Sequence, residues 1–421
     1  MTRGAMIVAT VSLGFFFVTA TTFTSLGYLL YTMVAELGWS QAAAGGSFAL
    51  LGLACGLGSP LPAVLMKAVG TRYTLVIGAL VLAAGFLLAA GVQGIALFFV
   101  ATAIMGIGFS LIAPSPGVFL IATWMPERAA RVLGFYFMAG AVGGVAGPLM
   151  VKTIVALSGS WRVHWATMGG LSVALAALFL LTIRDAVTVE STDQVKNAGH
   201  DAAAPAAASA WTVRAALRSP AFATIVLPMI VVQTVVTTMH SALVAHVAGL
   251  GMGADAGAWA MSLLALSGTI AKGVTGAATE RHDPRRLLMA GLILQAGGIA
   301  LLCVAGAPIA AMAAALLFGC GWGLAWLSAH ILILRYFGGA IAGDLTAAAT
   351  LATTVAVLGP LSAGWVADRT GSFVPVFAAF VALLLLATVS TLLFMRAPRQ
   401  LATLGDDTRA QDEAFALVAA E

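Results

Sequence analysis

Long apolar runs with almost no charge dominate this chain and restrict what it can fold into. No Asp, Glu, Lys or Arg occurs between Arg72 and Glu127, or between Arg286 and Arg335. A bilayer-spanning helix needs roughly 20 predominantly apolar residues. Only 9% of the 421 residues are charged, whereas a soluble domain carries about 25%. Lipid must therefore be the main solvent, and the sequence predicts an all-α membrane protein.

Twelve segments are long and apolar enough to cross a membrane. The first run follows Arg3 and extends to about residue 30, which is longer than the ~7–15 apolar residues of a signal peptide. We therefore interpret it as the first span. The expected spans lie near residues 6–34, 43–66, 73–92, 95–123, 132–155, 161–183, 220–247, 256–279, 286–306, 309–334, 344–366 and 373–395.

The spans divide into two sets of six. Between them lies a polar stretch with an Ala/Pro-rich centre at residues 202–208, a composition typical of linkers. We expect an N-terminal six-helix bundle over residues 1–183, a cytoplasmic linker over 184–218, a C-terminal six-helix bundle over 219–397 and a cytoplasmic tail over 398–421.

The basic residues predict the orientation, because cytoplasmic loops are enriched in Lys and Arg. With a cytoplasmic N-terminus, 16 of the 20 basic residues lie on the cytoplasmic side. Lys152, Arg162 and Arg369 lie on the other side, and Lys272 lies within a span. We expect a multi-pass protein of the bacterial inner membrane with both termini in the cytoplasm.

The two halves repeat one another with an offset of about 212 residues. Gly147-Pro148 in span five corresponds to Gly359-Pro360 in span eleven, and residues 159–161 correspond to 371–373. The loop at 63–72 corresponds to the loop at 276–285. Internal repeats of this kind place a binding site near the middle of the membrane, between halves that rock against each other.

The repeated loops resemble the G-x-L-x-D-R-x-G-R-R signature of the major facilitator superfamily. The first loop keeps Leu65, Gly70 and Arg72, but it has Lys67 and Ala68 where the family has Asp and Arg. The second keeps Gly276, Glu280, Arg281 and Arg285. The resemblance covers the whole chain and implies twelve transmembrane helices in two pseudo-symmetric six-helix bundles. It also implies gating roles for Arg72, Glu280, Arg281, Gly147, Pro148, Gly359 and Pro360.

Within that superfamily, the chain is most similar to the monocarboxylate porters and the bacterial oxalate/formate-type anion exchangers. The resemblance rests on residues 36–40, 124–134, 271–276 and 364–373. Monocarboxylate porters carry an Arg in span eight that binds the substrate carboxylate. Lys272 occupies that position here, and Gly268 stands where those porters have an Asp. The porters' Lys in span one and the exchangers' second cation in span eleven have no counterpart.

Lys272 is the most informative single residue. A cation at this depth costs at least ~2.5–3.5 kcal/mol, so such residues face a cavity or a partner. We expect its ammonium to bind an anionic substrate. Two alternatives are a side chain that extends to the interface and a structural contact with backbone carbonyls. All 16 Asp and Glu residues lie in loops, in tails or at span ends, which disfavours a drug/proton antiporter, because such a transporter needs a buried carboxylate.

Other polar and aromatic side chains within the spans are further candidates for the binding site. His240 shares span seven with several polar residues, and imidazole titrates near pH ~6.5, so His240 or Lys272 could carry a co-transported proton. Packing or hydrogen bonding within the bundle is the alternative role for each candidate. Besides Lys272, the expected substrate-binding residues are Tyr28, Tyr31, Tyr136, Gln233, His240, Trp326 and His330; Trp322 is a further candidate for the cavity wall.

These observations favour a secondary or facilitative transporter of small organic anions, monocarboxylates or short dicarboxylates, that works by alternating access. Either proton symport or anion exchange would fit. The alternative is an exporter of drugs or other hydrophobic solutes. We expect no enzymatic activity, because the spans lack the convergent acids or metal ligands that catalysis needs. We also expect no cofactor, no metal and no nucleic-acid partner, and a protein that works as a monomer in the bilayer.

Overall fold

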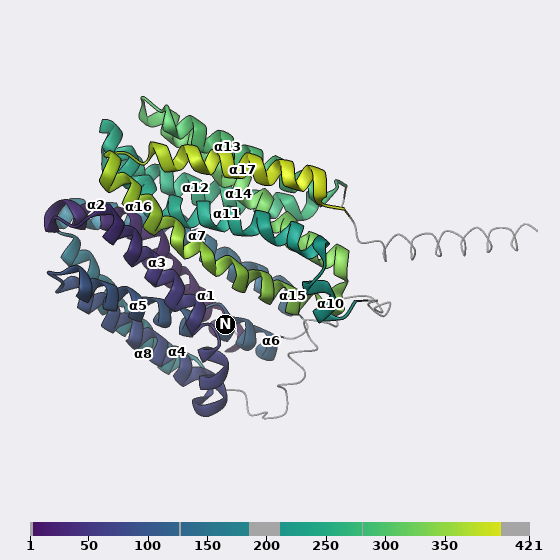
Figure 1. Ribbon diagram of the computed structural model, residues 1–421. Coiled ribbons are helices and arrows are strands. Elements are labelled where there is room, and N and C mark those ends of the chain that lie inside the picture. The colour runs from purple at the N-terminus through teal and green to yellow at the C-terminus, as the bar shows by residue number, and fades with distance from the viewer. Residues whose placement is uncertain (1–2, 126–127, 185–210, 280, 397–421) are drawn as a thin grey trace, which may run out of the picture.

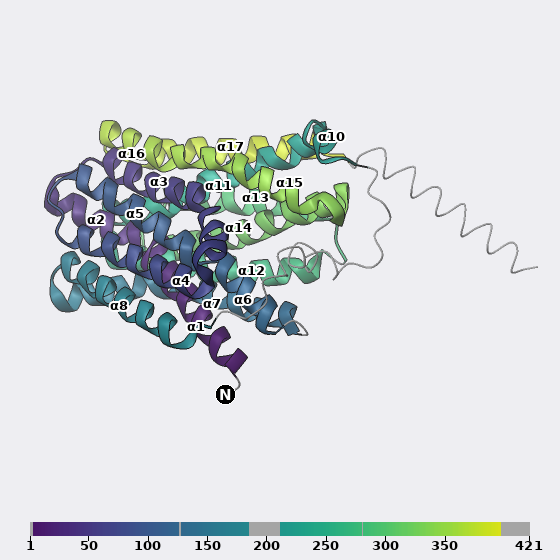
Figure 2. The same ribbon diagram turned by 90° about the horizontal axis from the view of Figure 1, so that it is seen from below.

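The computed structural model describes residues 3–125, 128–184, 211–279 and 281–396. In these ranges the chain is helical and contains no strand. The helices run side by side in two groups, one from each half of the sequence (Figure 1). The second view, turned by 90°, shows the same division (Figure 2). The expected all-α fold is confirmed.

The N-terminal half contributes six crossings. Helices form over the apolar runs because a chain in lipid must satisfy its backbone hydrogen bonds within the segment. The helices are α1 (Arg3–Thr21), α2 (Phe23–Leu37), α3 (Gln41–Gly58), α4 (Leu61–Ala90), α5 (Ile95–Ile112), α6 (Ser115–Trp124), α7 (Ala129–Ser158) and α8 (Trp161–Thr182).

The C-terminal half begins with a short helix and repeats the pattern of crossings. Its elements are α10 (Val213–Leu217), α11 (Pro220–Val247), the π-helix η2 (Ala248–Met252), α12 (Gly253–Ala278), α13 (Pro284–Cys303), α14 (Pro308–Phe337), α15 (Gly339–Ala352), the 3₁₀-helix η3 (Thr353–Val357), α16 (Leu358–Thr370) and α17 (Val374–Phe394).

Eleven helical segments among the described residues are apolar and long enough to cross a membrane, and one of them accounts for two crossings. The segment Pro220–Ala278 has 59 residues, which would extend about 88 Å as one straight helix. Gly251 and Gly253 both have a φ of 81°, a conformation that favours glycine. They reverse the chain so that Gly257 of α12 packs against Val244 of α11. The twelve expected crossings are therefore present.

Several crossings are broken where the sequence predicted continuous spans. The second was expected to reach residue 66, but α3 ends at Gly58 and a new helix starts at Leu61, after Ser59-Pro60. Gly70, with a φ of 84°, separates that piece from the rest of α4. Pro114 divides the fourth crossing into α5 and α6, because proline cannot donate a backbone hydrogen bond. The eleventh crossing is interrupted by η3.

Each half has its own hydrophobic core. One cluster of buried side chains extends from Ile7 to Ile183, and the other from Ala216 to Met395. Among the described residues of the second half, Val244 and Ala258 belong to the first cluster, and the partly buried Ala254 packs against it. The expected linker at 184–218 and the tail at 398–421 fall mostly on residues 185–210 and 397–421, which lie outside the described residues.

Matching contacts in the two halves confirm the pseudo-symmetry. Arg72 donates a hydrogen bond to the carbonyl of Leu180 in α8, and Arg285 donates to the carbonyl of Leu392 in α17. Each arginine thus ties the third crossing of its half to the carbonyl end of the sixth. Charged donors make the stronger hydrogen bonds, so these contacts hold each half together.

The structure has two faces that are used as reference points below. An even number of crossings brings Arg3 and Arg396 to one side, which we call the terminal face. The opposite side, at the left in Figure 1 near the labels α2 and α16, is the far face. It carries the turns after α2, α7 and α16, where Gly38, Gly159 and Gly371 adopt positive φ angles of 66°, 71° and 72°.

Candidate functional site

A cavity of about 780 Å³ lies between the two halves. We call it the central cavity. Its volume is in the range of sites that enclose most of a small ligand. Helices α1, α2, α3, α5 and α7 of the first half and α11, α12 and α14 of the second half surround it. The site therefore depends on both halves, as the repeat predicted.

The two halves line the central cavity with different chemistry. The second half contributes what we call the polar wall, which comprises Gln233, Thr237, His240, Thr269, Lys272 and Trp322. The first half contributes the aromatic wall, which comprises Phe15, Phe23, Phe48, Phe109, Phe137 and Met138. The described residues that line the cavity include one cation and no carboxylate.

Lys272 projects from α12 into the central cavity. Its Nζ lies 3.6 Å from the centroid of the Trp322 ring on α14, a separation at which the negative face of the ring attracts the cation. Within the described part of the chain, the ammonium has no hydrogen-bond acceptor and no carboxylate within 4.0 Å. The indole ring therefore compensates the charge only in part.

His240 lies on α11 beside the same indole. Its Nδ1 is 2.8 Å from the carbonyl oxygen of Val236, and its ring meets the Trp322 ring edge-on with centroids 5.9 Å apart. Since Nδ1 is used by the helix itself, Nε2 is the nitrogen that a ligand could reach. Gln233 lines the cavity from the same helix. The polar wall thus brings together three of the residues expected from the sequence.

The threonines around the central cavity offer acceptors rather than donors. The hydroxyls of Thr19, Thr24, Thr237 and Thr269 each donate to a backbone carbonyl in the preceding turn, at 2.8–3.0 Å. Hydroxyls in membrane helices commonly bond to their own backbone in this way. Their hydrogen atoms are therefore already engaged, and Lys272 is the one charged donor among the described residues that line this cavity.

The aromatic wall is an interlocked set of rings. Phe23 of α2 meets Phe48 of α3 and Phe109 of α5 edge-to-face, with centroids 5.9 and 5.3 Å apart. Phe15 of α1 meets Phe137 of α7 at 5.9 Å. Edge-to-face pairs of this kind are favourable beyond the area that they bury. The first half thus presents a firm apolar surface opposite Lys272.

Three of the expected aromatic residues lie elsewhere in the N-terminal half. Tyr136 is fully buried, and its hydroxyl donates to the carbonyl of Pro114 at 3.1 Å, so it joins α7 to the break between α5 and α6. Tyr28 is buried within α2. Tyr31 lines a separate small pocket near the far face. None of the three is among the residues that line the central cavity, and their expected role in substrate binding stays a prediction.

Trp326 and His330 pack against each other on α14. The Nδ1 of His330 is 2.8 Å from the carbonyl oxygen of Trp326, and the two ring centroids are 4.9 Å apart. Neither residue is among those that line the central cavity. His330 lies eight residues after Trp322, about two helical turns along α14. Their expected role in substrate binding stays a prediction.

The central cavity is closed toward the far face by direct contacts between the halves. Asp368, at the end of α16, accepts hydrogen bonds from the backbone amides of Gln41 and Ala42 at 2.6 and 2.8 Å. Both amides belong to the first turn of α3, where backbone donors lack partners and the helix dipole favours an anion. Lys152 of α7 pairs with Asp255 of α12 at 3.1 Å.

Glycines allow backbones of the two halves to meet on this side. A Cβ at Gly45 would overlap the carbonyl oxygen of Pro360, and one at Gly364 would overlap that of Gln41. Likewise, Gly27 of α2 packs against the carbonyl of His240. We call these three contacts the glycine seam. Small residues permit such close approach in membranes.

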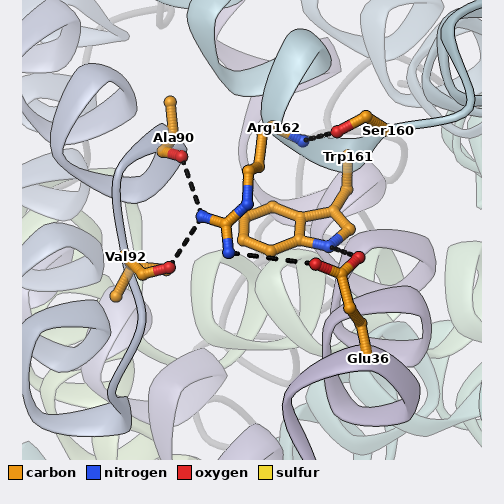
Figure 3. A network of polar contacts seen from close by, with 6 residues as sticks. All are labelled: Glu36, Ala90, Val92, Ser160, Trp161 and Arg162. Atoms are coloured by element: carbon orange, nitrogen blue, oxygen red, sulfur yellow. Dashed lines mark hydrogen bonds and ion pairs between the residues drawn. The ribbon is translucent and has the colours of Figure 1, made fainter.

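A polar network braces the first half at the far face (Figure 3). Glu36 accepts a hydrogen bond from the indole Nε1 of Trp161 at 2.7 Å and lies 3.8 Å from Arg162. One guanidinium nitrogen of Arg162 donates to the carbonyls of Ala90 and Val92, at 3.1 and 2.7 Å. The network joins the ends of α2, α4 and α8.

The residues expected to act in gating are distributed over both faces. Gly147 packs against Ala20 and Thr24 of the first crossing, and Gly359 packs against Thr234 and Thr238 of the seventh. Pro148 lies inside α7, and Pro360 lies in the first turn of α16. Arg72 bonds to α8, as described above, and Arg281 is exposed. Glu280 lies outside the described residues.

The sequence matches a family model over most of its length. The model of the Major Facilitator Superfamily matches residues 11–356 and 239–417. The chain belongs to the major facilitator superfamily. It is therefore a multi-pass membrane transporter, consistent with the two six-helix groups and the cavity between them.

The chain is similar to one curated protein, "Uncharacterized transporter YycB" of Bacillus subtilis (strain 168), with 29% identity over 182 residues. That match covers 41% of this chain and 43% of the relative, so the chain spans less than half the length of that protein.

Solved structures of transporters share the major facilitator fold seen here. The nucleoside transporter NupG aligns with a TM-score of 0.76 and 15% identity, covering 93% of this chain and all of the other. A D-xylose-proton symporter aligns with a TM-score of 0.72 and 18% identity, covering 94% and 98% of the two chains. At these identities the likeness establishes the fold alone.

Proposed function

We propose that this protein is a secondary transporter of small organic anions, either monocarboxylates or short dicarboxylates, that works by alternating access. The observation that carries the proposal is the Lys272 ammonium. It lies in a cavity between the two halves, and the described residues provide no anionic partner for it. An anion from solution would supply that partner.

The energetics support an anionic rather than a neutral substrate. A cation deep in a membrane protein carries a cost of at least ~2.5–3.5 kcal/mol. The face of a Trp ring returns up to about 2 kcal/mol when the pair is desolvated. A carboxylate at hydrogen-bond distance from Nζ would compensate the charge more fully, since charge-assisted hydrogen bonds are the stronger ones. His240 and Gln233 would orient the other oxygen.

The transport cycle in this proposal uses the relative movement of the two halves. The far face is closed by the Asp368 and Lys152 contacts and by the glycine seam. The basic residues concentrated on the other side favour a cytoplasmic terminal face, so this state would take up or release substrate on the cytoplasmic side of a bacterial inner membrane. Parting the far face while the terminal face closes would expose the same site outside. The protein would work as a monomer, because each chain contains both halves.

The central cavity offers two ways to couple the movement to a gradient. His240 or Lys272 would carry the proton in a symporter. In an exchanger, a second anion on Lys272 would permit the return step, and no further titrating group would be needed. The lack of a carboxylate among the described lining residues favours either of these over cation-coupled drug efflux.

Export of drugs or other hydrophobic solutes is the second candidate function. The aromatic wall favours it, because five phenylalanines and a methionine form much of the cavity surface. A neutral solute would leave Lys272 uncompensated, so this candidate predicts that the lysine is dispensable for transport.

Uptake into proteoliposomes decides between the two. A panel of labelled carboxylates would be tested with the native protein and with Lys272→Ala, Lys272→Gln and Lys272→Arg. We expect saturable uptake that both neutral variants abolish and that the arginine variant retains in part. Lys67→Gln is the matched control and should transport, because Lys67 is an exposed lysine on α4 outside the cavity lining. Normal carboxylate uptake by the neutral variants, or none by the native protein, would refute the anion proposal in favour of the exporter.

A further inference from the structure

We propose that the preferred substrate is an amphipathic monoanion, a carboxylate attached to an aromatic or similarly bulky apolar body. This inference rests on the proposed function and narrows it. It excludes short dicarboxylates as the best substrates and places acetate-sized anions well below aromatic ones. The observation behind it is the division of chemistry between the two walls of the central cavity.

The charged end of such a ligand fits the polar wall. Lys272 is the one cation among the described residues that line the cavity, and it lies against Trp322 beside His240. One cation compensates one carboxylate. A second carboxylate would face the neutral Gln233 amide, threonine oxygens whose hydrogens are already donated, or the aromatic wall, and none of these supplies a second positive charge. Burial of an unpaired carboxylate in such surroundings is strongly unfavourable.

The apolar end fits the aromatic wall. Phe15, Phe23, Phe48, Phe109 and Phe137 come from five different helices of the first half and face the same cavity. The polar side chains that line this side, Thr19 and Thr24, bond to their own backbone. Phenylalanine faces offer contact area and edge-to-face geometry to an aromatic ring. They offer nothing to the hydroxyls of a sugar or to a second charge.

Size supports the same assignment. A cavity of about 780 Å³ is far larger than an acetate or lactate ion would fill, and unfilled apolar surface contributes nothing to binding. Burying an apolar side chain the size of a phenyl ring is worth on the order of 1.5–3 kcal/mol, which corresponds to roughly 10- to 100-fold in affinity. We therefore expect 3-phenylpropionate to bind about 10-fold or more tightly than propionate, its counterpart without the ring.

The first test is a competition experiment with native protein in proteoliposomes. Unlabelled acetate, propionate, succinate, benzoate and 3-phenylpropionate would each be titrated against uptake of labelled 3-phenylpropionate and of labelled propionate. The proposal requires half-inhibition by 3-phenylpropionate at concentrations about 10-fold or more below propionate, with succinate weaker than either. Equal or better inhibition by propionate or succinate would overturn it.

Variants of the aromatic wall provide the second test. Phe137→Leu and Phe23→Leu keep an apolar side chain but remove a ring, and should reduce the preference for 3-phenylpropionate over propionate by several-fold. Phe135→Leu is the matched control, because Phe135 is two residues away on α7, 58% exposed and outside the lining. It should leave the preference unchanged. Equal effects of Phe135→Leu and Phe137→Leu would contradict the assignment of this wall.

The outcomes separate this inference from the proposed function. Uptake that depends on Lys272 but favours propionate or succinate would leave an anion transporter standing and refute the amphipathic substrate. Uptake of no carboxylate at all would refute both. Preference for 3-phenylpropionate that survives Lys272→Gln would show that the aromatic wall binds the ring without the charge, and would also overturn the inference.

Discussion

Replacing Lys272 by methionine should raise the stability of the ligand-free protein while it abolishes anion binding. Methionine keeps an unbranched chain beside Trp322 and can make sulfur–aromatic contacts. The change removes a buried cation that costs at least ~2.5–3.5 kcal/mol, and it gives up a cation–π contact worth about 2 kcal/mol. The balance is a gain of about 1 kcal/mol in the free energy of unfolding, since the substituted side chain needs no partner.

The assay is equilibrium unfolding in mixed detergent micelles, with and without 3-phenylpropionate. At a ligand concentration 100 times its dissociation constant, the native protein should gain about 2.7 kcal/mol, and the Lys272→Met protein should gain nothing. Lys152→Met is the matched control. Its native pair with Asp255 at 3.1 Å is partly exposed, so its loss should cost about 0–1 kcal/mol, a change opposite in sign.

Two results would refute this reasoning. The Lys272→Met protein could prove less stable than the native protein by 1 kcal/mol or more. That result would show that the ammonium has a structural partner within the protein and is not left free to bind a ligand. Full stabilisation of that variant by 3-phenylpropionate would show that the anion binds elsewhere. Either result would remove Lys272 from the proposed site.

Three further changes test other parts of the structure. Gly273→Leu places a side chain in the cavity, where a Cβ would meet nothing within 4 Å. The variant should be as stable as the native protein or more so, since Gly is poor in helices, but its uptake of 3-phenylpropionate should fall 10-fold or more. Unchanged uptake would contradict the cavity assignment. Asp368→Ala removes a helix cap worth about 0.5–2 kcal/mol, and the far face should open more often as a result. A cysteine introduced by Ala44→Cys should then be alkylated from the far face roughly 2- to 30-fold faster. An unchanged rate would show that Asp368 does not hold this face closed. Arg285→Gln should lower the free energy of unfolding by about 1–2 kcal/mol, measured by the same detergent titration, and a neutral effect would argue against its bonds to α17.

The sequence was sufficient for the number of crossings, the two-fold repeat and the position of Lys272 at a cavity. Each of these depends on a property that a membrane imposes locally. A span must be apolar over a minimum length, and a charge within it is exceptional enough to identify a site by itself. The matching bonds of Arg72 and Arg285 show that the sequence offset corresponds to a real structural repeat.

The cavity wall could not be predicted in the same way. In lipid, an apolar side chain gains little by facing the protein interior rather than the acyl chains, so hydrophobicity does not separate Phe137 in the cavity from Phe135 outside it. Tyr136, between them, was expected to bind substrate as an aromatic residue, yet its ring is buried and its hydroxyl donates to the carbonyl of Pro114. Neighbouring residues of a helix point about 100° apart, so the rotation of α7 about its own axis decides which of these side chains faces the cavity. That rotation is set by how α7 packs against other helices.

The role of Asp368 was also beyond the sequence. Its position at the end of a span was clear, but its partners are amides about 327 residues earlier in the chain. The contact depends on how the first turn of α3 approaches α16 across the interface between the halves. No local pattern encodes that approach.

The glycine seam has a consequence for how fast the halves can separate. At Gly27, Gly45 and Gly364 the backbone of one half lies directly against a backbone carbonyl of the other, because glycine has no side chain. Interdigitated side chains must change rotamers before two surfaces part, whereas these three backbone contacts can separate without such a change. The resistance to opening is then concentrated in a few polar contacts at the rim, so the opening rate can be tuned by substitutions there without altering the shape of the binding site.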